Sequence, residues 1–156
     1  MKKLSNVLWW AFFVFLSVVI QAFVPGLDAL VVGRVILLQA RDYKNLLWLL
    51  PLFILLQEGM GTRVFGTAII FYTATFLLFR MGRWLFEVEN FVFIFLLSSC
   101  IGVAYFGVYW LMAHLHDIVF SYKTTIDLCL VQALYVPFAW RFFTALRPKV
   151  TNAEEK

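Results

Sequence analysis

Glu58 and Arg63 are the first pair of side chains in this sequence that could do chemistry. They lie in Leu-Leu-Gln-Glu-Gly-Met-Gly-Thr-Arg-Val-Phe-Gly, residues 55–66, between two very apolar runs. A carboxylate at the edge of hydrocarbon is costly and normally faces protein, water or a partner. Because no second acid or nucleophile lies nearby in the sequence, we assign no catalytic residue to this segment.

The glycines around this pair favour a tight hairpin near one membrane surface. Gly59, Gly61 and Gly66 allow turns and close backbone approach that other residues resist. Glu58 and Arg63 then have three interpretations. They form an ion pair that holds the hairpin, they contact a partner helix, or they are separately solvated at the level of the lipid headgroups.

His114, His116 and Asp117 form the second chemically suggestive group. The two imidazoles are two residues apart, which suits neither one helix face nor the usual zinc spacing of four. We interpret them as polar residues at a membrane interface and predict no metal site. The sequence also lacks a phosphate loop, a dinucleotide fingerprint and a haem attachment motif, so we expect no cofactor and no enzyme activity.

Composition indicates which solvent the elements face. The chain has 156 residues, of which 63% are hydrophobic and only 14% charged, whereas a soluble domain carries about 25% charge. The apolar residues come in long runs rather than amphipathic stripes, which predicts an all-α integral membrane protein. The excess of Lys and Arg is typical of cytoplasmic loops and does not indicate nucleic-acid binding.

Six apolar segments are candidate membrane spans. The second is doubtful, because its 14 residues cover roughly 21 Å against a hydrocarbon core of roughly 30 Å, and spans two to four are all short. The six are Val7–Val24, Leu27–Ala40, Leu46–Leu56, Val64–Phe79, Phe91–Ala113 and Ile126–Leu146.

The distribution of basic residues favours six spans over five. With six spans and the N-terminus inside, ten of the 13 Lys and Arg residues fall on the cytoplasmic side, two fall outside, and Arg34 lies within a span. Five spans would move most of them outside, against the positive-inside rule. We therefore predict a bundle of six short transmembrane helices over residues 1–148, a polar cytoplasmic tail over 149–156, and both termini in the cytoplasm.

Two polar residues lie inside the predicted spans. Arg34 either snorkels toward the cytoplasmic surface or forms an ion pair with an acid on a neighbouring helix or partner. Gln132, like Gln21 and Gln57, is expected to form hydrogen bonds between helices.

Helix packing and helix shape have their own signals. Ser98 and Gly102 have the small-xxx-small spacing that allows close helix contact, within the chain or with a partner. Pro51 and Pro137 lie within predicted spans, where we expect kinks.

Three segments carry a resemblance to the rod-shape-determining protein MreD family. Pro25-Gly26-Leu27-Asp28 resembles its polar break before the second helix. Residues 58–66 resemble its acid–glycine hairpin, with Glu58 in place of the usual Asp. Residues 132–138, followed by Arg141 and Arg147, resemble its last helix, which contains a proline and ends in basic residues.

The resemblance implies a multi-pass protein of the bacterial cytoplasmic (inner) membrane. Such a protein is a non-enzymatic scaffold of the cell-wall elongation machinery that controls cell shape. The implied partners are an MreC-like single-span protein, an MreB-like filament, a RodA-type synthase with its transpeptidase, and membrane lipid. The alternative is a small-solute subunit similar to the vitamin-binding S-components of energy-coupling transporters, which would need a polar cavity within the membrane.

Overall fold

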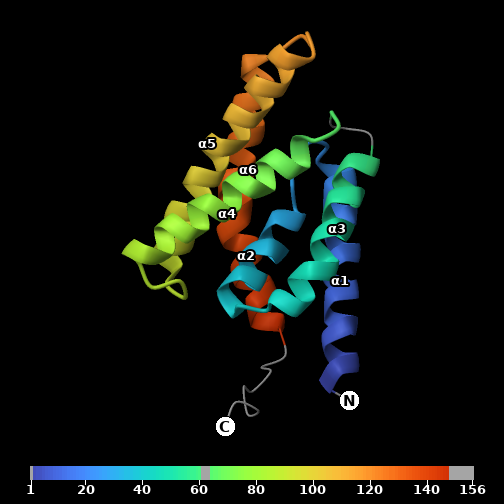
Figure 1. Cartoon of the computed structure of the whole chain (residues 1–156), viewed down its shortest axis with the longest axis vertical. Coiled ribbons are helices and arrows are strands. Elements are labelled where there is room, and N and C mark those ends of the chain that lie inside the picture. The colour runs from blue at the N-terminus through green and yellow to red at the C-terminus, as the bar shows by residue number, and fades with distance from the viewer. Residues whose placement is uncertain (1, 61–63, 148–156) are drawn as a thin grey trace.

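The computed structural model describes residues 2–60 and 64–147, and within these ranges the fold is entirely helical, without β-strands (Figure 1). Its helices are α1 (Lys2–Phe23), α2 (Leu30–Ala40), α3 (Tyr43–Gly59), α4 (Thr67–Leu85), α5 (Phe91–Leu115) and α6 (Tyr122–Leu146). All six segments proposed from the sequence contain a helix. Residues 149–156, the predicted tail, lie outside the described ranges.

Among the described residues, three helices are long and apolar enough to cross a membrane: α1, α5 and α6. Large apolar side chains are exposed on their outer faces, including Phe15 of α1 and Val103 of α5. Such faces suit lipid better than water, so the structure supports a membrane protein. The number of spans and the side on which the termini lie stay predictions.

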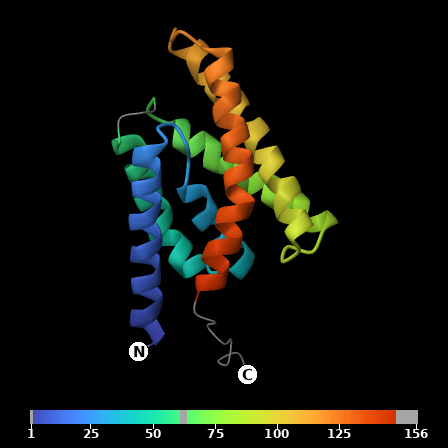
Figure 2. The ribbon, with the colours of Figure 1, turned by 180° about the vertical axis from the view of Figure 1, so that it is seen from behind.

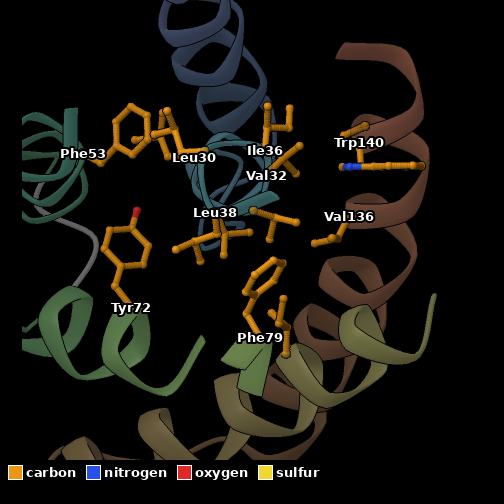
Figure 3. Close-up of a cluster of buried hydrophobic side chains, with 14 of the residues drawn as sticks. Leu30, Val32, Ile36, Leu38, Phe53, Tyr72, Phe79, Val136 and Trp140 are labelled. Carbon is orange, nitrogen blue, oxygen red and sulfur yellow. The ribbon is translucent and has the colours of Figure 1, made fainter. Parts of the chain in front are cut away.

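The short helix α2 is the centre of the bundle. All nine residues from Leu30 to Leu38 are buried, so protein surrounds this helix on every side. Figure 3 shows side chains of α2 meeting those of three other helices: Phe53 of α3, Tyr72 and Phe79 of α4, and Val136 and Trp140 of α6. At roughly 16 Å, α2 is shorter than the hydrocarbon core of roughly 30 Å, and the other helices of the chain surround it.

Aromatic rings attach α1 to this core. The ring of Phe13 lies 4.7 Å from that of Phe143 on α6 and 6.2 Å from that of Phe53 on α3. Trp9 stacks on Phe13 at 5.8 Å between centroids. Rings at these separations attract one another beyond the burial of their area, so α1 is held by its inner face while its outer face stays exposed.

The helices α5 and α6 run side by side in opposite directions in both views (Figures 1 and 2). The hydroxyl of Ser98 donates to the carbonyl of Ala133 on α6. A Cβ on Gly102 would stand 3.1 Å from the carbonyl oxygen of Cys129 and 3.2 Å from the Cβ of Ala133. The structure therefore places Ser98 and Gly102 at a close contact between helices of this chain.

Both prolines lie inside helices, Pro51 in α3 and Pro137 in α6. Figure 1 shows that the ribbon of α3 bends along its length. A proline removes one backbone donor and crowds the preceding turn, which accounts for a bend in this helix.

The α5–α6 contact generates a matched pair of substitutions. Gly102→Leu forces a side chain against the backbone of α6, and overpacking of this kind costs about 1–3 kcal/mol or more. Gly107→Leu lies on the same helix in open space and is expected to change stability by less than about 1 kcal/mol. Thermal unfolding of both variants in mild detergent measures the difference, and equal melting temperatures would contradict this packing.

Candidate functional site

Asp28 is the centre of a buried polar network at the start of α2. Its Oδ1 accepts hydrogen bonds from Gln57 Nε2 of α3 at 2.6 Å, from the amide of Val31 at 3.1 Å and from the hydroxyl of Tyr72 of α4 at 3.3 Å. Gln132 of α6 accepts from the Asp28 amide at 2.9 Å and donates to the Asp28 carbonyl at 3.0 Å. We call these five residues the Asp28 network. It joins four helices at one point.

The Asp28 network supplies a hydrogen-bond partner that the buried start of α2 needs. The first amides of a helix have no partner within the helix, and α2 begins inside the protein rather than in water. The Asp28 carboxylate satisfies one of these amides and places negative charge at the positive end of the helix dipole. The interhelical hydrogen bonds expected for Gln57 and Gln132 are present here, whereas both polar atoms of the Gln21 amide are buried without a hydrogen-bond partner.

Arg34 is the buried cation of this region. It is 6% exposed, and its guanidinium lies 5.1 Å from the centroid of the Tyr72 ring. Its Nε and Nη1 are buried and form no hydrogen bond. Arg34 therefore does not snorkel to a surface, contrary to that sequence interpretation, because its charged end faces an aromatic ring within the bundle. Tyr72 thus contacts both the buried cation and, through its hydroxyl, Asp28.

A second polar contact holds the other end of α2. The side chain of Gln39 accepts from Trp140 Nε1 of α6 at 2.6 Å and donates to the carbonyl of Val88 in the α4–α5 loop. We call this contact the Gln39 bridge. With the Asp28 network, it ties both ends of the central helix to α6.

Glu58 contacts the residue that precedes α4. Glu58 Oε1 accepts from the amide of Gly66 at 2.8 Å, and Gly66 has a φ of +89°, which favours glycine. Gly59 is the last residue of α3. Gly61 and Arg63 lie outside the described residues, so the Glu58–Arg63 ion pair stays a prediction.

Arg147 connects three elements just beyond the end of α6. Its guanidinium lies 5.7 Å and 5.8 Å from the ring centroids of Trp9 and Trp10 and 3.7 Å from Asp42 Oδ2 at the start of α3. Burial lowers the pKa of Arg147 from its ordinary value, and the Asp42 carboxylate opposes that shift. The basic end of α6 therefore holds α1 and α3 together.

Two grooves flank the outer face of α4. The small-residue groove, of about 570 Å³, lies between α4 and α5. It is lined by Ala74, Leu77, Leu78 and Met81 of α4 and by Ser99, Cys100, Val103 and Ala104 of α5. The arginine groove, of about 970 Å³, lies among α2, α3 and α4 and is lined by Leu38, Tyr43 and residues of α4 from Phe76 to Leu85, including Arg80, Arg83 and Trp84.

The two histidines bond within their own helix turns. His114 Nδ1 lies 2.9 Å from the carbonyl of Trp110, and His116 Nδ1 lies 3.1 Å from that of Met112. Across residues 2–60 and 64–147, no three His, Cys, Asp or Glu side chains form a group that could hold a metal ion. The structure therefore gives these histidines a local contact and no ligand set.

Sequence reasoning overlooked Asp28 and Gln39 as organising residues. Asp28 attracted notice only within the segment that resembles a family motif, although an acid just before a short apolar helix is a known cap pattern. Gln39 carries no pattern of its own, since its partners lie 49 and 101 residues away.

The Asp28 network predicts opposite outcomes for two buried glutamines. Gln132→Leu removes the hydrogen bonds that Gln132 forms with the amide and carbonyl of Asp28, so stability should fall by about 1–3 kcal/mol. Gln21→Leu removes an amide that has no hydrogen-bond partner and should be neutral or stabilising. Denaturation in detergent measures the stability of the two variants. A Gln21→Leu variant that is less stable than Gln132→Leu would rule out the network as described.

We compared the chain with protein-family models, curated proteins and solved structures. The chain matches no protein-family model, no curated protein and no solved structure.

Proposed function

We propose that this protein is a non-enzymatic membrane scaffold that receives one transmembrane helix of a partner protein in the small-residue groove. The observation that carries the proposal is the groove itself. It is an open apolar groove of about 570 Å³ on the outer surface of two packed helices, and half of its lining residues are small.

The spacing of the lining residues suits a helix as occupant. Ala74, Leu77, Leu78 and Met81 stand at i, i+3, i+4 and i+7, so they form one continuous stripe on α4. Between helices in lipid, association depends mainly on close packing, and small side chains allow the backbones to approach.

The lining of α5 supplies most of these small side chains. Ser99, Cys100 and Ala104 lie on the exposed side of α5, next to the small residues that this helix already uses against α6. The hydroxyl of Ser99 donates to the carbonyl of Phe95 within its own helix. Because that hydroxyl is already bonded, shape rather than polar contact would select the partner helix.

The resemblance to the MreD family supplies the wider role that we propose. In that role the protein lies in the bacterial inner membrane with six spans and both termini in the cytoplasm, and it supports cell-wall elongation and cell shape. An MreC-like protein, which has a single span, is the proposed donor of the helix. The MreB-like filament and the RodA-type synthase with its transpeptidase are further members of the proposed assembly.

Arg34 supports a second candidate function, binding of a small anionic solute. Its Nε and Nη1 are buried without hydrogen-bond partners, and an ionisable residue inside a membrane protein is by default a candidate functional site. Purification in mild detergent followed by mass spectrometry of extracted small molecules tests this alternative. A stoichiometric anion that Arg34→Met no longer retains would favour it over the scaffold.

Filling the groove tests the scaffold directly. Ala104→Leu places a larger side chain in the lining and should reduce co-purification of the MreC-like protein by about tenfold, because a lost close contact in lipid costs on the order of 1–2 kcal/mol. The matched control is Ala11→Leu on the exposed face of α1, which should have no effect.

A cross-link reports on the same contact without the risk of misfolding. Cys100 lines the groove and is exposed. In a Cys129→Ser background, Cys100 should form a disulfide with a cysteine introduced into the partner's span. The proposal would be refuted if the Ala104→Leu variant co-purified the MreC-like protein at the wild-type level and Cys100 formed no cross-link.

A further inference from the structure

The arginine groove combines two kinds of surface that rarely occur together on a lipid-facing helix. Most of its lining is apolar, with Leu38 of α2, Tyr43 of α3 and Phe76 of α4 on its walls. Arg80 and Arg83 line the same groove from the C-terminal part of α4, and both are exposed. An apolar channel with two cations at one end matches a molecule that has an apolar body and an anionic head.

Trp84 favours a position of this end of the groove near a membrane surface. It is 86% exposed at the end of α4, and exposed tryptophans near helix ends concentrate at the level of lipid headgroups. Long arginine side chains reach that level while their stems stay against apolar surface. Arg80 and Arg83 are therefore placed where phosphate groups of lipids lie.

The guanidinium groups of Arg80 and Arg83 are available for an external anion. Within the described ranges, neither forms an ion pair with a carboxylate of this chain. Asp42, beside the lining residue Tyr43, is engaged by Arg147 at 3.7 Å and by the Asn45 side chain at 2.6 Å.

Other charged residues lie near the groove in the sequence. Arg41 and Lys44 flank the α2–α3 junction, next in sequence to the lining residue Tyr43 or within two residues of it, and both are exposed. Glu87 and Glu89 follow α4 in the next loop and are also exposed. The Gln39 bridge holds the carbonyl of Val88, between those two acids, toward the end of α2. Four cations against two unpaired acids leave the region positive.

We infer that the arginine groove binds an anionic phospholipid, with its phosphate on Arg80 and Arg83 and an acyl chain along Phe76 and Leu77. Basic pockets between membrane helices recognise anionic headgroups in this way. A volume of about 970 Å³ lies at the upper end of the range for small-molecule sites. The apolar majority of the lining selects a lipid over a free phosphate ion. This inference does not depend on the proposed partner helix.

The test uses the full chain purified in a neutral detergent. Phosphatidylglycerol is added, and native mass spectrometry and thermal unfolding record bound lipid and the shift in melting temperature. Phosphatidylcholine with the same acyl chains and inorganic phosphate are the comparison probes. We expect the protein to retain phosphatidylglycerol and to be stabilised by it, and neither comparison probe to have this effect.

The double variant Arg80→Gln with Arg83→Gln should weaken binding of phosphatidylglycerol about 25-fold, since each cation near a membrane surface contributes roughly fivefold.

Two further variants separate charge from folding. Arg80→Lys with Arg83→Lys keeps both charges and should retain most of the binding. Arg141→Gln removes an exposed arginine of α6 that does not line the groove, and it should bind as wild type. Equal effects of phosphatidylcholine, protection by inorganic phosphate alone, or unchanged binding by the double glutamine variant would overturn the inference.

Discussion

The architecture depends on one constraint: a short helix buried on all sides must have both of its ends satisfied by protein. Unpaired amides or carbonyls that are buried away from water are costly. The Asp28 network meets this requirement at the start of α2, and at its end the amides of Arg41 and Asp42 turn back to carbonyls of the last turn. Because both ends are paired, the other helices can pack against α2 on every side, through its apolar side chains and, at Tyr72, through Arg34.

Because α2 occupies the centre, the outer helices differ in how much surface they leave free. The helix α1 packs one aromatic face against the core, and α5 and α6 pack closely against each other. The helix α4 packs through Phe71, Tyr72 and Phe79 but leaves its other side open. The two grooves lie on that open side and share Leu77 and Met81, so occupants of the two grooves would meet along α4.

The sequence predicted features that depend on neighbouring residues, such as helices and helix-packing motifs. It did not predict contacts between residues that are far apart in the chain. Long apolar runs predicted all six helices, and the small-xxx-small spacing of Ser98 and Gly102 indicated close packing. The doubtful segment Leu27–Ala40 was counted as a span on the distribution of charge alone, because its apolarity fits a lipid-facing span and a buried core helix equally. Arg34 was interpreted by its position in the chain, whereas its actual neighbour, Tyr72, is 38 residues away. Both grooves arise from tertiary arrangement, which composition and spacing do not encode.

The ties between α2 and α6 also have a consequence for biosynthesis. Gln132 and Trp140 lie 104 and 101 residues after their partners Asp28 and Gln39. A ribosome has therefore made most of the chain before either end of α2 meets its α6 contacts. Until then, the nascent protein holds a short helix with incompletely paired polar ends at the membrane. Maturation thus waits for the last helix, and a chain that ends early presents to membrane quality control the polar groups that the complete protein hides.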